Sequence, residues 1–184
     1  MNKILKIHIL GFFIISVIGT LIHFTYELSN YTYVIGIFSA VNESIFEHLK
    51  LLVFGIVIFM LYEHIILYKD NNRYLFARLV SIIIGVFSII TIYYTYTFFT
   101  KESIVIIDII LFYLSVLISQ IISYKILVNK LFKFKENHNK LINKHSKYLL
   151  IITICIFFFF TFYPPKINMF KDPITGNYGI LNLK

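Results

Sequence analysis

The chain has 184 residues, of which 59% are hydrophobic and only 14% are charged, and its mean hydropathy is +0.82. In a soluble domain about a quarter of the residues are charged, so the composition excludes that class and predicts a polytopic membrane protein. The net charge of +8 does not indicate nucleic-acid binding, because basic residues of membrane proteins gather in cytoplasmic loops. Cys155 is the single cysteine, which excludes an intrachain disulfide and a cysteine-based zinc site.

Five apolar stretches are predicted to cross the bilayer as helices, because about 20 residues span about 30 Å of hydrocarbon at about 1.5 Å per residue. The predicted helices are 4–24, 42–68, 74–99, 103–124 and 148–163. For the first stretch the alternative is a cleaved signal peptide, but the run exceeds a usual apolar region of that kind and no clean A-x-A site follows it. The segment 25–41 has an apolar patch too short to span, and we interpret it as interfacial or re-entrant.

Residues 125–147 are predicted to form a basic cytoplasmic loop, with seven lysines and Glu136 as the one acidic residue. Apolar residues alternate with the lysines, which is compatible with an amphipathic helix on anionic lipid; an ordinary positive-inside loop is the alternative. Pro164-Pro165 ends the last helix. Beyond it, the run from Asp172 to Gly179 contains a proline and two glycines and predicts a turn.

The positions of the basic residues predict the orientation. In a five-helix arrangement, Lys3, Lys6 and the loop 125–147 fall on one side, whereas the acidic segment 27–47 and the tail fall on the other. The basic side is cytoplasmic, so the N-terminus lies inside and the C-terminus outside. We therefore expect an all-α bundle of five transmembrane helices at 1–165 and an extended extracytoplasmic tail at 166–184, in a bacterial cytoplasmic membrane.

Polar residues are concentrated at 42–50, where the second helix is expected to begin. On a helix from Asn42, Glu43 and Glu47 share a face and His48 lies beside them, which makes Glu43, Glu47 and His48 candidate catalytic residues. Imidazoles and carboxylates together can hold a divalent cation or work as acid and base. The spacing matches no diagnostic metal motif, so the identity of any cofactor stays open. The candidate binding residues at the same face are His23, Glu27, Asn42, Asp108, Asp172 and Tyr178.

A purely structural role is the alternative for this stretch. Ser44 and Glu47 have the spacing of a capping box, Asn42 is a favoured N-cap residue, and acidic side chains suit the first turn of a helix. A cap explains Ser44 and one glutamate, but it does not explain His48 or His23.

Three further polar features lie inside the predicted spans. Asp108 is expected to face the bundle with a partner among His23, His48 and Lys101, because an unpaired carboxylate in the hydrocarbon is unfavourable. The pair Glu63-His64 is interpreted as interfacial or as the inner end of a polar path. The tyrosines of 93–96 resemble an aromatic belt.

Three runs carry a family resemblance: H-F-x-Y-E at 23–27, V-N-E-S-x-x-E-H-L-K-L at 41–51 and F-x-D-P-x-T-G-x-Y-G-I at 170–180. Together they resemble a group of small uncharacterised multi-pass membrane proteins of Gram-positive anaerobic bacteria, classed as a domain of unknown function. Phe46 stands where that group is expected to have Trp, which affects packing rather than chemistry, and Ala40 stands where Pro is expected. The resemblance implies no activity.

Three functional classes are compatible with these residues. The first is a metal- or acid/base-dependent hydrolase that acts on a lipid or its head group, with Glu43 or Glu47 as base and the histidines as ligands. The second is a proton- or cation-coupled transporter, with Glu63 and His64 at the inner exit. The third is an assembly subunit whose polar residues only cap and anchor helices. The lipid bilayer is the one partner the sequence defines, and protein partners and the substrate stay undetermined.

Overall fold

The computed structural model describes residues 3–67, 71–128, 130–132 and 136–180, and their regular structure is helical apart from an isolated β-bridge between Lys171 and Tyr178. The elements are α1 (Lys3–Leu28), α2 (Tyr33–Gly36), α3 (Ile45–Leu67), α4 (Tyr74–Thr100), α5 (Val105–Leu127), α6 (Glu136–Phe162) and the 3-10 helix η1 (Asn168–Phe170). Within the described residues, five helices are long and apolar enough to cross a membrane, which confirms the predicted class of multi-pass all-α protein.

Several helix boundaries differ from the sequence expectation, and α1 continues to Leu28, into the segment 25–41 expected to be interfacial or re-entrant. Helix α3 begins at Ile45 rather than at Asn42, because Asn42 and Ser44 form its capping turn. Helix α6 begins at Glu136 rather than at 148, since no glycine or proline interrupts 136–163 and the helix continues through residues assigned to the loop. This early part of α6 packs on the bundle, where Asn143 Oδ1 accepts the backbone N–H groups of Leu75 and Phe76 at the start of α4.

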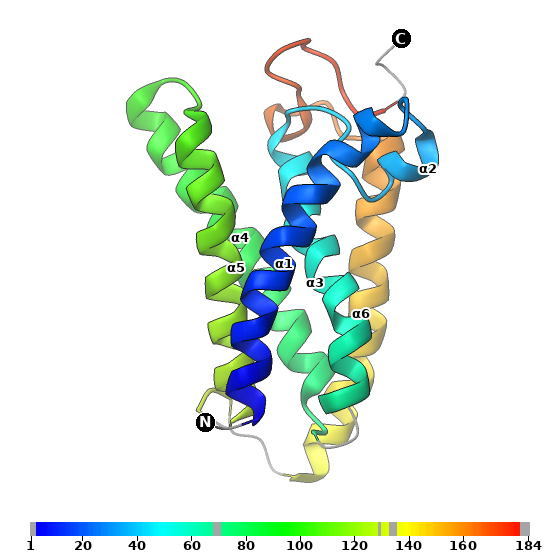
Figure 1. Ribbon diagram of the computed structural model, residues 1–184, viewed down its shortest axis with the longest axis vertical. Helices are drawn as coiled ribbons and strands as arrows, with labels where there is room; N and C mark the ends of the chain where they lie inside the picture. The colour runs from blue at the N-terminus through cyan, green and yellow to red at the C-terminus, as the bar shows by residue number, and fades with distance from the viewer. Residues whose placement is uncertain (1–2, 68–70, 129, 133–135, 181–184) are drawn as a thin grey trace.

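The long helices run alternately up and down (Figure 1). The start of α1, the end of α3, the start of α4 and the start of α6 lie at one end of the bundle, whereas α2, the turn between α4 and α5, and the tail after α6 lie at the other. Helix α1 packs against α3 and α5, and α4 packs against α3, α5 and α6. At the end that carries α2, the hairpin of α4 and α5 leans away from α1 and α3 (Figure 1).

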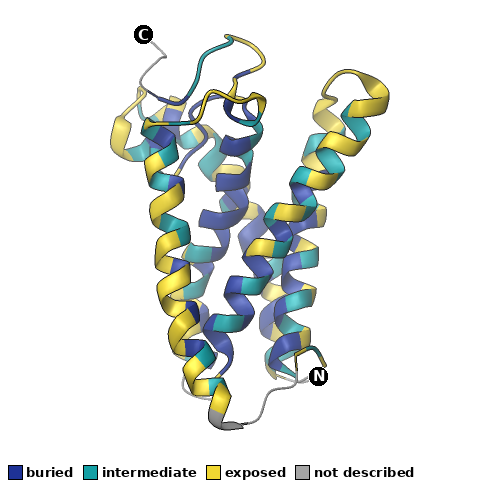
Figure 2. Ribbon diagram, turned by 180° about the vertical axis from the view of Figure 1, so that it is seen from behind, coloured by how far each residue is buried: buried dark blue, intermediate teal, exposed yellow. Residues whose placement is uncertain are grey.

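Helix α3 contributes most to the packed interior. Its fully buried side chains include Leu52, Phe54, Ile56 and Phe59, and Ile15 of α1 is equally buried. The outer faces of the other long helices stay exposed, as the yellow bands of Figure 2 show. Because those exposed residues are apolar, these faces suit hydrocarbon, in which a helix satisfies its own backbone hydrogen bonds.

Small residues bring α4 and α5 into close contact. A Cβ at Gly85 would collide with Ser119 Oγ and Leu52 Cδ2, so any larger residue here requires those side chains to move. Ser119 Oγ donates to Ser81 O at 3.0 Å, and the hydroxyls of Ser88 and Ser115 lie 3.1 Å apart. Such small and hydroxyl-bearing residues allow membrane helices to approach closely, so α4 and α5 form a tight pair.

A buried ion pair lies near the opposite end of the bundle from α2. Arg78 of α4 donates from both Nε and Nη2 to the carboxylate of Glu63 on α3, and both side chains are fully buried. Arg78 also approaches Gln120 of α5, and His8 of α1 lies 3.9 Å from Glu63 and 3.0 Å from the Ser123 hydroxyl. The sequence interpretation of Glu63 as interfacial is therefore wrong, because Glu63 is buried inside the bundle, where Arg78 neutralises it.

Candidate metal centre

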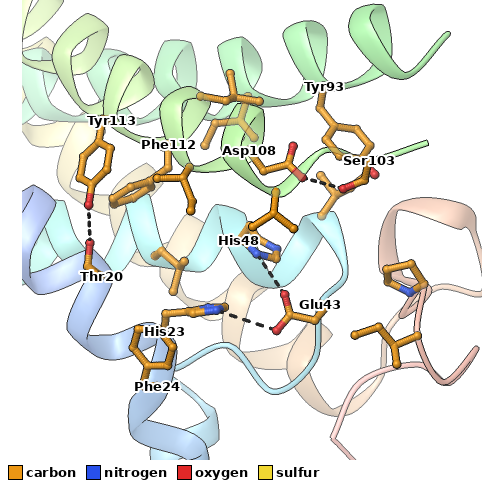
Figure 3. A pocket seen from close by; sticks show the side chains of 18 residues that line it. Thr20, His23, Phe24, Glu43, His48, Tyr93, Ser103, Asp108, Phe112 and Tyr113 are labelled. Carbon is orange, nitrogen blue, oxygen red and sulfur yellow. Dashed lines mark hydrogen bonds and ion pairs between the residues drawn. The ribbon is translucent and has the colours of Figure 1, made fainter. Parts of the chain in front are cut away.

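A cavity of about 710 Å³ lies in the wedge between the hairpin of α4 and α5 and the pair of α1 and α3 (Figure 3). Its polar lining residues come from both sides of the wedge. They include Thr20, His23, Glu43, His48, Ser103 and Asp108. The remaining wall is formed largely by aliphatic and aromatic side chains, so the cavity is an apolar space with polar groups at defined positions.

The capping turn of α3 positions Glu43 and His48. The Ser44 N–H donates to Asn42 Oδ1 at 2.9 Å, and Ser44 Oγ accepts the Glu47 N–H at 3.4 Å. Glu43 therefore projects from the turn rather than from the helix. His48 stands in the first helical turn, where its Nδ1 lies 2.9 Å from Ser44 O.

This hydrogen bond assigns the tautomer of a neutral His48. A carbonyl oxygen can only accept, so Nδ1 carries the proton and Nε2 keeps a free electron pair. Nε2 is the atom that faces Glu43, at 3.5 Å from its Oε2. Histidines that bind metals commonly donate their other N–H to a carbonyl in this way.

His23, Glu43 and His48 form one group, which we call the His/Glu/His group (Figure 3). His23 Nε2 lies 3.8 Å from Glu43 Oε1, and one ligand atom from each residue lies within 4.8 Å of the other two. In a tetrahedral zinc site with bonds of 2.0 to 2.1 Å, neighbouring ligand atoms are about 3.3 Å apart. The separations of 3.5 and 3.8 Å to Glu43 are close to that value, and none of the three exceeds 4.8 Å, so the side chains must move inward by up to about 1.5 Å to bind an ion.

The chemistry of the His/Glu/His group fits a catalytic rather than a structural metal. Two histidines and one glutamate supply three ligands, and catalytic zinc sites keep a fourth position for water or substrate. All three residues line the cavity, and the Glu43 side chain is 46% exposed, so the open side of the group faces accessible space.

Asp108 lies across the cavity from His48 (Figure 3). Its carboxylate accepts hydrogen bonds from the hydroxyl of Tyr96 and, at 2.7 Å, from Ser103 Oγ. The expectation of a partner among His23, His48 and Lys101 is therefore wrong, because Asp108 accepts hydrogen bonds from Tyr96, near the end of α4, and from Ser103, in the turn before α5. Tyr96, interpreted from the sequence as part of an aromatic belt, also donates a hydrogen bond to the Asp108 carboxylate.

Glu47 does not join the His/Glu/His group. It is buried on another side of α3, where Oε2 lies 2.7 Å from Lys50 Nζ and accepts the Val41 N–H at 3.0 Å. Lys50 Nζ also donates to Gly36 O at 2.7 Å and to Thr161 Oγ1 of α6 at 3.2 Å. Through these hydrogen bonds, the buried pair of Glu47 and Lys50 links the segment that precedes α3 with helix α6. Sequence reasoning missed Lys50, although its spacing of three from Glu47 was a usable signal.

The other expected site residues lie around the cavity or away from it. Glu27 is exposed near the end of α1, and Asn42 is buried in the capping turn. Asp172 is buried and organises the tail turn by accepting the N–H groups of Ile174 and Thr175. Tyr178 pairs with Lys171 across the same turn. Pro173 and Ile174 line the cavity, so the tail reaches the site through its apolar residues.

Replacement of Asp172 tests how firmly this turn is held. Asp172→Ala removes the acceptor of two backbone N–H groups, and we expect local opening of 172–178 to become about tenfold more frequent. Hydrogen–deuterium exchange of that segment, followed by mass spectrometry, measures the change. Asp172→Asn is the matched control because it keeps one acceptor oxygen and should exchange at an intermediate rate. Unchanged exchange in Asp172→Ala would contradict the role of the carboxylate.

The described chain is thus a multi-pass membrane protein with a His/Glu/His group in a cavity between its helices. The chain belongs to the family described as Family of unknown function (DUF6512), whose family model matches residues 1–180. This match confirms the expected resemblance to a family of unknown function over nearly the whole chain. No curated protein and no solved structure matches the chain.

Proposed function

We propose that this protein is a membrane-embedded metal-dependent hydrolase in which His23, Glu43 and His48 bind a divalent ion such as zinc. The observation that carries the proposal is the convergence of three ligand atoms within 4.8 Å on the wall of a 710 Å³ cavity. In neutral His48 the proton is on Nδ1, so Nε2 is free to bind a metal ion, and the Glu43 side chain is partly exposed. Both observations support a metal site with an open coordination position rather than a closed structural site.

The chemistry that such an ion supplies is activation of water and polarisation of an ester oxygen. Water adds to the carbon or phosphorus of the ester, and the bond to the alcohol oxygen breaks. The alcohol leaves with one proton, and the other product is the acid. One water is consumed and no oxidant or second substrate is required. Asp108, which accepts hydrogen bonds from Tyr96 and Ser103, lies on the cavity wall opposite the His/Glu/His group.

The hydrolase is favoured over the transporter by the packing between the two polar groups of the bundle. At intermediate depth Ile15 of α1 packs against Gly55 of α3, and Leu52 and Ile56 of α3 are fully buried as well. Along α3 these apolar residues separate the His/Glu/His group from the pair of Glu63 and Arg78, whereas the buried hydroxyls of Ser81, Ser115 and Ser119 lie between α4 and α5. The Glu63 carboxylate is moreover already neutralised by Arg78, so it is a poor carrier for a cation.

We further propose that the His/Glu/His group faces the outside of a bacterial cytoplasmic membrane. The start of α1, with Lys3 and Lys6, and the early part of α6, with Lys140 and Lys144, lie toward the opposite end of the bundle, and basic residues favour the cytoplasmic side. In this orientation the N-terminus is inside, residues 1–165 form the bundle and 166–184 an extracytoplasmic tail. The segment with α2 is then an interfacial or re-entrant piece, and the lysines of 125–147 meet anionic lipid.

Metal content tests the proposal. Detergent-purified protein equilibrated with zinc and desalted is expected to keep about one ion per chain, measured by plasma mass spectrometry. His23→Ala, Glu43→Gln and His48→Ala should each lower zinc affinity at least about 100-fold, because removal of a direct ligand exceeds the 10- to 100-fold loss at outer-shell positions.

The control variant is His145→Ala, which removes an exposed histidine of α6 and should leave zinc binding unchanged. Absence of zinc, manganese and iron from the wild-type protein would overturn the metal site. Equal retention in the wild type and the His48→Ala variant would also overturn it, since the ion would then lie elsewhere.

A further inference from the structure

The cavity is lined by both α1 and α5, two of the helices long and apolar enough to span a membrane. Helices α1 and α5 touch where the ring of Phe112 fills the space beside Gly19 and where the hydroxyls of Thr20 and Tyr113 lie 3.1 Å apart. Beyond these contacts the hairpin of α4 and α5 leans away from α1 (Figure 1). The contacts between Thr20 and Tyr113 therefore form the floor of the cavity.

The rim of the cavity is apolar and exposed. Phe24 of α1 is 52% exposed, and Val105 and Ile109 of α5 are 71% and 51% exposed, although all three line the cavity. All three lie within helices that are long and apolar enough to span a membrane, and exposed apolar side chains on such helices suit contact with lipid. An acyl chain can therefore pass from the bilayer into the cavity without crossing a polar surface.

The polar groups of the cavity lie on two opposing walls. The His/Glu/His group occupies the wall of α1 and α3, and Asp108 with Ser103 occupies the wall of α5 (Figure 3). An ion at the first wall attracts the oxygen of an ester or phosphate. Asp108 can only accept hydrogen bonds when ionised, so the second wall selects a group that carries an O–H or N–H donor.

We propose that the ligand of this cavity is a membrane lipid that enters between α1 and α5, with its ester oxygen at the His/Glu/His group and a hydroxyl or amine of its head group at Asp108. Hydrolysis of the bound lipid's ester rests on the proposed function. Lipid binding itself does not require the metal. A volume of about 710 Å³ suits one chain segment with a head group, because ligand cavities commonly measure about 300 to 1,000 Å³.

The chain contains no Trp, so an introduced indole reports on a single position. The Ile109→Trp variant places it in the cavity, and the Phe13→Trp variant places it on the exposed face of α1 as the control. Metal-free protein is reconstituted in vesicles of unbrominated phosphatidylcholine, in which a defined fraction is replaced by phosphatidylcholine, phosphatidylethanolamine or phosphatidylglycerol with brominated acyl chains. Quenching of the indole measures lipid occupancy.

In the Ile109→Trp variant, we expect phosphatidylethanolamine or phosphatidylglycerol to bind about tenfold more tightly than phosphatidylcholine, whose head group lacks a donor. Adding Asp108→Asn should remove this preference, and the Phe13→Trp variant should show none. Thermal unfolding of the Asp108→Asn variant verifies that it is folded. If it is not folded, Ser103→Ala, which leaves the carboxylate in place, should retain the preference.

Three results would overturn the proposal. Equal quenching by all lipids in the Ile109→Trp variant would remove the head-group selectivity. Absence of quenching there, with normal quenching in the Phe13→Trp variant, would exclude lipid from the cavity. Full displacement by soluble glycerophosphoglycerol at the same concentration would assign the cavity to a water-soluble ligand. Selective lipid binding in a protein that retains no zinc would instead contradict only the proposed hydrolase.

Discussion

Replacement of Glu63 by glutamine is expected to lower the free energy of unfolding by about 3 to 5 kcal/mol, because the fully buried Arg78 then has no counter-ion. The guanidinium donates through two nitrogens to this carboxylate, and the neutral amide offers one acceptor without charge. The ion pair also joins α3 to α4, so its loss loosens the end of the bundle near the start of α1. A titration with SDS in mixed micelles measures the unfolding free energy.

The double variant Glu63→Leu, Arg78→Met distinguishes the ion pair from a simple packing contact. Apolar residues of similar volume often replace a buried pair with little loss or with a gain in stability. We therefore expect the double variant to be more stable than Glu63→Gln. A loss below about 0.5 kcal/mol in Glu63→Gln would contradict the role of the pair, since that is the range of ordinary surface substitutions.

Replacement of Lys50 by methionine is expected to lower the free energy of unfolding by about 3 to 5 kcal/mol as well, because the buried Glu47 carboxylate loses its counter-ion. The substitution also frees Gly36 O and Thr161 Oγ1, which Lys50 holds from two different parts of the chain. The same SDS titration measures this loss, and Lys144→Met, at an exposed position of α6, is the control.

The Lys50→Met variant should also bind zinc more weakly. The Glu47 carboxylate holds Val41, two residues before Glu43, so loosening it displaces one ligand of the His/Glu/His group. In the double variant Glu47→Gln, Lys50→Met the uncompensated charge is removed and most of the stability should return. If zinc affinity in Lys50→Met equals that of the wild type, the pair does not position the site.

Sequence reasoning located the region of the candidate site but not its membership. The motif at 41–51 drew attention to Glu43, Glu47 and His48, and His23 was included from the end of the preceding helix. The assumption of a helix from Asn42 placed Glu43 and Glu47 on one face. Because the capping turn delays the helix to Ile45, Glu43 projects from the turn and meets the histidines, while Glu47 turns toward Lys50.

The sequence by itself determined the class of protein and the spans, because hydrophobic length and helix capping depend on neighbouring residues. Long apolar runs, the Pro164-Pro165 stop and the polar stretch at 42–50 are all readable without tertiary contacts. Only the tertiary structure decided which charges pair. Arg78 forms an ion pair with Glu63 on another helix, and Asp108 accepts a hydrogen bond from Tyr96 on the other side of a turn. Such choices depend on how the helices are rotated and tilted against one another, and that packing is set by small residues and side-chain shapes far apart in the chain.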